Sequence, residues 1–341
     1  MIFYKENKMN LYTTLKQLCL CPSVSGRENN IRKLLSDLVT PLVDEVRTDA
    51  LGNLIATKRG NRDGKKIMLC AHMDEIGFLV TFIEDSGMLR VASVGGIRAT
   101  AAANSVVVSE NGTLGVIVPE GNVKELSVDK LYIDLGTKSK KESERKVAIG
   151  DFFVCRPDLV KLAGTRVAGR PLDDRIGCAV LLAIAEKLSD GNFAGEVDLV
   201  FSVQEEVGCR GARPAAFGLE PDYALCFDVT ATGDFIGASP MACKVGGGAA
   251  VKIKDSSVIC HEEVVADLCA LAQKNKISYQ REILLAGGTD TSSMQLAGAG
   301  TRAGALSVPT RYIHSSTELC DLSDAEACID LACAFINEKL N

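Results

Sequence analysis

The sequence predicts an α/β fold that is interrupted by a β-rich insertion. After Arg170, helical and strand patterns alternate, as is typical of an α/β domain. Between Ile76 and Thr165, short β-rich stretches are separated by glycine. Polar motifs flank this stretch, with His72 and Asp74 before it and the others after it. We therefore expect a discontinuous α/β domain of residues 1–74 and 166–341, and an inserted β-rich domain of residues 75–165.

Composition supports a globular protein and excludes several classes. Of 341 residues, 47% are hydrophobic, and 31 are glycine. The net charge of −6 provides no basic surface for nucleic acid or an anionic membrane. No run approaches the roughly 18 apolar residues of a membrane span. No apolar leader with a cleavage site is present either, so we expect a cytoplasmic protein. The thirteen cysteines form no C-x-x-C pair and mostly lie in apolar segments, which favours reduced core thiols over disulfides.

Helix and strand patterns can be placed before, within and after the insertion. Ser25 and Glu28 have the spacing of a capping box before a helical pattern that starts at Ile31. Strands are predicted for Leu51–Thr57, Lys66–Ala71, Phe78–Ile83, Leu89–Val94, Ser105–Val108, Leu114–Val118, Val197–Val203 and Tyr223–Phe227. Helices are predicted for Arg175–Leu188, Glu262–Lys274 and Asp321–Leu340.

Two adjacent acids, Glu205 and Glu206, end the apolar run Val197–Val203. Successive strand residues point to opposite faces of a sheet. Both carboxylates can therefore serve one site only where the strand ends and the backbone turns. Such a site would lie at the carboxyl edge of a sheet.

Other polar residues also lie at the ends of apolar segments. His72 follows a buried run, Asp228 follows Tyr223–Phe227, and His314 follows the run Gly304–Val308 within a polar motif. Asp173 and Asp174 begin the helix at Arg175, where an N-cap role is at least as good an explanation when the pair is taken alone. The third histidine, His261, opens a helix, and we expect a capping or surface role for it.

Together these residues predict a metal site. Open α/β folds bind ligands at the carboxyl edge of the sheet, where the two histidines and the acids would converge. Imidazole and carboxylate without thiolate suit Zn, Co or Mn. A carboxylate that bridges two ions, with one histidine and one acid for each ion, describes a two-metal hydrolytic site. The second glutamate of the pair would then be a base that does not bind metal.

At this level of detail the chain resembles the tetrahedral (TET) aminopeptidases, a family of cytosolic dinuclear metallo-aminopeptidases that includes glutamyl and leucyl aminopeptidases. The resemblance extends over ordered motifs along the chain, namely Leu20–Gly26, Ala71–Phe78, Leu172–Gly177, Gln204–Gly208, Phe227–Thr230, Asp255–Ser257, Gly287–Asp290 and Ser307–Ser315. The family usually has alanine where this chain has Thr291, and Cys209 and Cys243 lie near the same segments. These departures leave the substrate preference open.

The resemblance implies a role for each candidate residue. Asp173 would bridge two divalent ions, Zn or Co, with His72 and Asp228 completing one site and Glu206 and His314 the other. Glu205 would be the general base, and Asp74 would orient His72 from behind. Asp174 is not expected to bind metal.

The resemblance also implies a fold and an activity. The fold would be zinc-exopeptidase-like, with a central mixed sheet flanked by helices and an inserted small β-barrel-like domain that mediates assembly into dimers and tetrahedral dodecamers. The activity would be removal of the amino-terminal residue from short peptides by a water that two metal ions activate. Two alternatives stay open: a carboxylate-pair glycosidase, which does not explain the histidines, and a non-catalytic assembly protein with the same fold.

Overall fold

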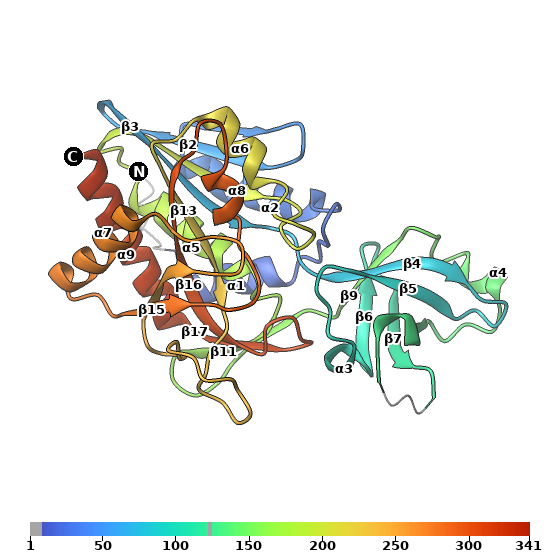
Figure 1. Ribbon diagram of the computed structural model, residues 1–341. Coiled ribbons are helices and arrows are strands. Elements are labelled where there is room, and N and C mark those ends of the chain that lie inside the picture. Colours follow the sequence, from blue (N-terminus) through green and yellow to red (C-terminus); the bar gives the residue numbers. More distant parts are fainter. Residues whose placement is uncertain (1–8, 122–124) are drawn as a thin grey trace, which may run out of the picture.

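The computed structural model describes residues 9–121 and 125–341, which form a large α/β part and a smaller barrel beside it (Figure 1). The predicted fold class is confirmed. The large part contains an eleven-stranded mixed sheet with the path β1-β2-β12-β3-β13-β16-β17-β11-β10, and β14 and β15 branch from β16. The smaller part is a closed barrel of six strands in the order β4-β5-β8-β7-β6-β9.

Four parallel strands form the centre of the large sheet. They are β12 (Ala194–Ser202), β3 (Arg62–His72), β13 (Tyr223–Thr230) and β16 (Arg302–Arg311). Their carboxyl ends therefore lie at one edge of the sheet. The remaining strands of this sheet are β1 (Glu45–Thr48), β2 (Leu54–Arg59), β10 (Asp158–Lys161), β11 (Arg166–Arg170), β14 (Ala249–Lys254), β15 (Tyr279–Ile283) and β17 (Glu318–Asp321).

The two faces of the sheet are buried by different helices. Along β3, Ile67 and Leu69 belong to one hydrophobic core and Met68 and Cys70 to another, as the alternation of strand side chains requires. The first core includes residues of α1 (Leu11–Cys19), α2 (Asn29–Val39), α5 (Arg175–Lys187), α7 (Glu262–Asn275) and α9 (Leu322–Leu340). The second core includes residues of α6 (Ala212–Leu219) and α8 (Thr291–Gln295).

The barrel has its own apolar core, which includes Phe78, Ile117 and Phe153. Its strands are β4 (Gly77–Ile83), β5 (Leu89–Val94), β6 (Ser105–Ser109), β7 (Leu114–Pro119), β8 (Leu131–Asp134) and β9 (Phe152–Cys155), with short helices α3 (Ala99–Ala102) and α4 (Lys140–Ser143). The strand β10 lies within the range that we assigned to the insertion, but it pairs with β11 in the large sheet. We therefore propose that the inserted domain ends near Cys155. The sequence did not indicate this boundary, because a short isolated strand does not reveal the sheet to which it belongs.

Several expected boundaries need correction. The capping box is wrong: the hydroxyl of Ser25 donates to Asp74 Oδ2 (2.6 Å), and Glu28 accepts from the backbone N–H of Gly26 (2.7 Å). Local spacing cannot reveal a partner that lies 49 residues away. The strand that carries Asp228 continues to Thr230, so this acid lies inside the strand and not after it. The helices predicted after the insertion, in contrast, are confirmed within two residues of their ends.

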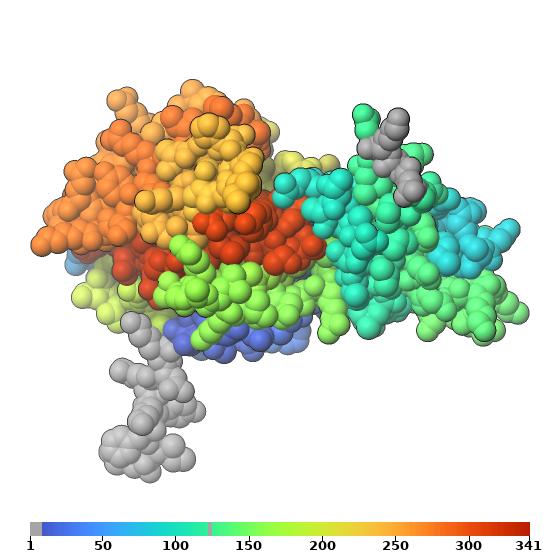
Figure 2. All heavy atoms as spheres, turned by 90° about the horizontal axis from the view of Figure 1, so that it is seen from below, coloured from blue at the N-terminus to red at the C-terminus, as the bar shows by residue number. Residues whose placement is uncertain are grey.

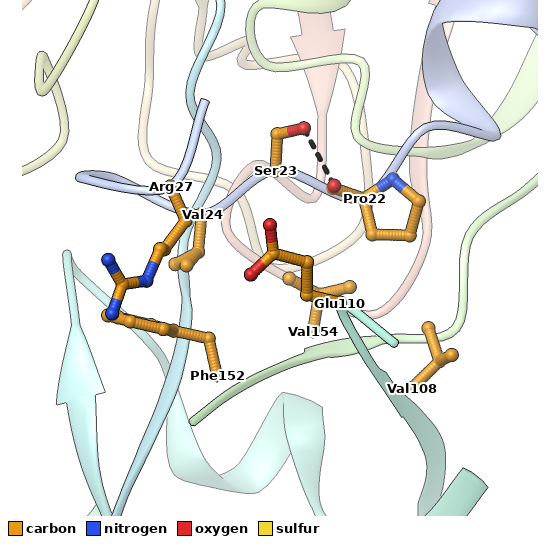
Figure 3. Close-up of a pocket in the computed structure, with 8 residues that line it drawn as sticks. All are labelled: Pro22, Ser23, Val24, Arg27, Val108, Glu110, Phe152 and Val154. Carbon is orange, nitrogen blue, oxygen red and sulfur yellow. Dashed lines mark hydrogen bonds between the residues drawn. The ribbon is translucent and has the colours of Figure 1, made fainter. Parts of the chain in front are cut away.

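The loop Pro22–Arg27 lies against the barrel (Figure 3). The Arg27 guanidinium stands over the ring of Phe152, 5.2 Å from its centroid. Val24, Val108 and Val154 line the small hollow beside this pair. Val24 of the same loop also forms an isolated β-bridge with Glu75, which lies between β3 and β4. The loop therefore contacts the chain where it passes from the large sheet to the barrel.

Two composition-based expectations concern the whole chain. All thirteen cysteines are free, and ten of them are buried, as expected for core thiols. In the part of the chain that the structure describes, no helix is both long and apolar enough to cross a membrane.

Candidate metal centre

The structure brings the five predicted metal ligands together at the carboxyl edge of the central strands. His72 is the last residue of β3, and Asp228 lies two residues before the end of β13. The other three come from connections: Asp173 between β11 and α5, Glu206 after β12, and His314 after β16. Two groups of possible ligands result. One contains His72, Asp173 and Asp228, and the other contains Asp173, Glu206 and His314. Within each group the possible ligand atoms lie within 4.8 Å of one another.

Asp173 stands between the two histidines. Its Oδ1 lies 3.0 Å from Nε2 of His72, and its Oδ2 lies 3.2 Å from Nε2 of His314. Asp228 Oδ1 lies 3.9 Å from the same nitrogen of His72, and Glu206 Oε2 lies 3.2 Å from that of His314. One carboxylate thus presents one oxygen to each group, which is the arrangement that a bridging ligand requires.

Asp74 connects the first histidine to the two glutamates. Its Oδ1 accepts from the backbone N–H of Glu205 (3.0 Å), and its Oδ2 accepts from that of Glu206 (3.3 Å). Oδ1 also lies 3.5 Å from Nδ1 of His72, but the backbone carbonyl of Asp74 is closer to that nitrogen, at 3.1 Å. The carboxylate therefore holds the turn that carries the two glutamates as well as facing the histidine.

Glu318, which the sequence reasoning missed, fixes the other two ligand-bearing loops. This buried carboxylate accepts from the backbone N–H groups of Leu172 (2.6 Å) and Asp173 (3.1 Å) with Oε2, and from that of His314 (3.1 Å) with Oε1. It lies at the start of a short strand, without a helical or alternating pattern that could have distinguished it from an ordinary acid.

The barrel also contributes to the centre. The carbonyl oxygen of Gly96 lies 2.9 Å from Nδ1 of His314, and Arg98 donates to the carbonyl of Ile313 (2.6 Å). Figure 2 shows the segment around residues 310–320 in red, lying against the barrel in teal. A Cβ atom at position 96 would lie 2.9 Å from His314 Nδ1, so the close approach requires glycine there.

The remaining candidates fall outside the two groups. Glu205 is half-buried beside them, and its Oε1 accepts a hydrogen bond from the thiol of Cys209 (3.1 Å). Asp174 caps α5 by accepting from the N–H of Gly177 (3.0 Å), as the N-cap interpretation predicts. His261 is the residue before α7, but its side chain makes no capping hydrogen bond within the described chain, and it belongs to neither group.

Several ionisable groups of the centre have pKa values that are shifted from their usual range. Burial raises the pKa of Glu205, of Glu206 and of Asp228 above the usual carboxyl range, and neighbouring carboxylates add to the effect. Burial acts to lower the pKa of His314, but Asp173 and Glu206 outweigh it and raise that pKa to about 11. These raised pKa values favour protonation of the three acids and of His314, and bound cations would compete with those protons.

The residues fit divalent cations. Glu206 Oε1 is buried and has no hydrogen-bond partner among the described residues, which leaves an oxygen available as a ligand. The donors are imidazole nitrogens and carboxylate oxygens, which suit Zn and Co. Each histidine also has a carbonyl oxygen at its second nitrogen, the usual support for a metal-binding imidazole.

Comparisons with known sequences agree over most of the chain. The family model described as M42 glutamyl aminopeptidase matches residues 52–331. A protein of Acetivibrio thermocellus, provisionally named an aminopeptidase, is 44% identical over 94% of this chain and 97% of its own length. The lysyl aminopeptidase of Pyrococcus furiosus is 33% identical, with coverage of 95% and 96%.

Solved structures show the same fold. An aminopeptidase of the archaeon Desulfurococcus kamchatkensis has a TM-score of 0.93 at 36% identity, covering 97% of this chain and 95% of that one. The TET1 peptidase of Pyrococcus horikoshii, which can assemble into a tetrahedron or a large octahedral shell, has a TM-score of 0.87 at 34% identity, with coverage of 96% and 100%. A protein of Thermotoga maritima described as an endoglucanase has a TM-score of 0.80 at 32% identity, with coverage of 95% and 96%. With a family model over residues 52–331 and near-full-length relatives above 30% identity, this chain belongs to the M42 glutamyl aminopeptidase family of hydrolases.

Proposed function

We propose that the protein is a dinuclear metallo-aminopeptidase. His72 and Asp228 would hold one divalent cation, Glu206 and His314 the other, and Asp173 would bridge them. The observation that supports this most strongly is the position of the Asp173 carboxylate, which presents one oxygen to each histidine at 3.0 and 3.2 Å. Zn and Co both suit the donors.

When bound, the cations would supply a water of lowered pKa and polarise the peptide carbonyl. Glu205 would take the proton of the attacking water, a role that is supported by its position outside either group of candidate ligands and next to Glu206. As a carboxylate it would accept that proton and return it to the leaving amine. Asp74 keeps Glu205 in place through the backbone N–H.

The substrates would be short peptides with a free amino terminus. A largely apolar hollow adjoins the centre, since its lining includes Ala231 and Thr232, which continue β13 beyond Asp228, and Ile313, which precedes His314. We propose that this hollow receives substrate side chains. Its lining also includes Arg98 and Arg281, so the preferred residue needs to be measured.

The test is hydrolysis of chromogenic Leu, Glu, Lys and Ala substrates after chelation and after re-addition of Zn or Co. We expect loss of hydrolysis on chelation and recovery with either ion. N-acetylated forms of the same substrates are the matched control and should stay uncleaved. Hydrolysis of none of the free substrates under either ion would overturn the proposal.

We also propose that the chain self-associates, into dimers and a tetrahedral dodecamer. The TET1 peptidase of P. horikoshii can assemble into a tetrahedron. Both parts of this chain expose large apolar side chains, including Phe82, Leu114 and Ile149 on the barrel and Ile236 and Leu285 on the large part. Light scattering of the purified protein tests this. A monomer at micromolar concentration would refute it.

A second function, glycoside hydrolysis, is suggested by the description of the T. maritima protein as an endoglucanase. That chemistry uses two carboxyl groups and needs no metal. It leaves the two histidines without a role. Cleavage of soluble glucans that survives chelation would favour it over peptide hydrolysis. A non-catalytic assembly protein would show neither activity, although all the required side chains are present here.

A further inference from the structure

A third group of metal-binding side chains lies beside the two described above. Glu205, Cys209 and Asp290 each present a ligand atom, and the three atoms lie within 4.8 Å of one another. Bonds of roughly 2.0–2.3 Å from zinc to oxygen and sulfur allow ligand atoms to stand up to about 4.5 Å apart. Small side-chain rotations would therefore be enough to bring the three atoms around one ion.

Asp290 has one oxygen without a hydrogen-bond partner in the described part of the chain. Its Oδ2 accepts from the Ser202 hydroxyl (2.5 Å) and faces the Cys70 thiol (3.6 Å). Its Oδ1 is buried and has no hydrogen-bond partner among residues 9–121 and 125–341, although the residue is only 1% exposed. Such a buried, unpaired carboxylate oxygen is costly unless a cation or water satisfies it.

Hydrogen bonds hold Cys209 next to Glu205 and next to the helix that follows Asp290. Its backbone N–H donates to the carbonyl of Glu205 (2.8 Å), and its own carbonyl accepts from the Ser293 hydroxyl (2.7 Å) on the helix that follows Asp290. Its thiol is half-buried and lies 3.1 Å from Glu205 Oε1. The backbone of Cys209 is thus fixed, and only side-chain rotations are needed to gather the three ligand atoms around an ion.

We propose that Glu205, Cys209 and Asp290 form a third, inhibitory site for a thiophilic divalent cation, with Zn²⁺ as the natural ion and Cd²⁺ as its probe. The thiol distinguishes this site from the other two, which have only nitrogen and oxygen donors, and makes it selective for Zn²⁺ and Cd²⁺ over Co²⁺ or Mn²⁺. On binding, the thiol proton leaves to solvent and the sulfur becomes a ligand. Inhibition rests on the proposed function, because the ion would take the carboxylate that serves there as the base.

The experiment adds Cd²⁺ to enzyme already loaded with two Co²⁺ per chain. Three quantities are measured: bound ions per chain, the ultraviolet charge-transfer absorption of a cadmium thiolate, and hydrolysis of an aminoacyl substrate. We expect one additional ion, a thiolate band and loss of hydrolysis. In Cys209→Ser, which keeps a hydroxyl donor facing Glu205, the band should disappear, and the Cd²⁺ needed for half-inhibition should rise about tenfold or more because one of three protein ligands is lost.

Two further variants make the result specific. Asp290→Asn keeps the thiol but removes the second charge, so it should also weaken the additional ion. Cys333→Ala removes another half-buried thiol, on α9, and should behave as the wild type. The site is refuted if the wild type binds no additional ion, or if Cys209→Ser binds it equally well.

The binding measurements do not depend on hydrolysis, so the two proposals can fail separately. A cysteine-dependent third ion that leaves hydrolysis unchanged would overturn the inhibitory role and count against Glu205 as the base. An enzyme without any peptidase activity that still binds this ion would overturn the proposed function and keep the site.

Discussion

Glu318→Gln tests whether one buried carboxylate holds the two loops that carry Asp173 and His314, the proposed bridging and terminal ligands. The carboxylate accepts three backbone N–H groups, those of Leu172, Asp173 and His314, at 2.6 to 3.1 Å. Glutamine has the same shape but only one acceptor oxygen, and its amide N–H₂ must face at least one of these N–H donors. The change thus removes acceptor capacity with little change in packing.

The magnitude follows from the lost hydrogen bonds. A hydrogen bond to a charged group contributes about 1.5–3 kcal/mol, and the facing N–H would be left buried and unpaired. Burial raises the pKa of Glu318 to about 7, so the carboxylate is charged only above that pH, and there we expect the free energy of unfolding of the metal-free protein to fall by roughly 2–4 kcal/mol. We also expect the affinity for both ions to fall by roughly 10–100-fold, because the bridging Asp173 and His314 lose the group that fixes them.

Urea unfolding of the metal-free protein and chelator competition for the ions measure these two effects. Glu326→Gln, an exposed glutamate on α9, is the matched control and should change stability by less than about 0.5 kcal/mol. The reasoning is refuted if Glu318→Gln matches this control in stability and binds both ions with wild-type affinity.

Three further predictions concern other parts of the molecule. Asp74→Asn replaces one of the two oxygens that accept from the N–H groups of Glu205 and Glu206 with an amide donor, so the rate of hydrolysis should fall by roughly 10–100-fold. Equal steady-state rates for the variant and the wild type would contradict the role of Asp74. Gly96→Ala places a methyl group 2.9 Å from His314 Nδ1, so chelator competition should show weaker binding of one ion, and unchanged affinity would exclude this steric effect. Burial raises the pKa of Asp198 to about 6, above about 3.9 in the unfolded chain, so its protonated form stabilises the fold below pH 4 and that contribution is lost as the pH rises through 6. In urea unfolding, the free energy of unfolding of Asp198→Asn relative to the wild type should therefore increase by roughly 1–3 kcal/mol between pH 4 and pH 8. A pH-independent difference would disprove the pKa shift.

The fold class could be predicted because it depends on patterns that are local in sequence. The buried run that ends at His72 and the apolar stretch of the helix at Arg175 identify their elements without knowledge of the fold. The sheet to which β10 belongs could not be predicted, since a four-residue strand acquires its partner only in three dimensions.

Several candidate ligands could be singled out because they lie at or near the end of an apolar segment, as His72, Glu206 and Asp228 do. Asp173, at the start of a helix, receives its role from the family resemblance.

The groups that hold these ligands could not be predicted. Glu318 lies in a strand like many other acids, and its three partners come from two distant loops. Ser25 has the spacing of a helix cap, yet it binds Asp74. Such supporting contacts depend on tertiary packing, which local spacing does not encode.

The division of labour between Glu205 and Glu206 is the central claim, and the metal content and turnover of Glu205→Gln test it most directly. If Glu205 moves the proton and Glu206 binds the ion, the variant should retain about two ions per chain and lose roughly 10²–10⁴-fold in hydrolysis. Glu206→Gln, a change at the adjacent residue, should instead lower the affinity for a metal ion. Full activity of Glu205→Gln, or loss of a bound ion from it, would contradict the account.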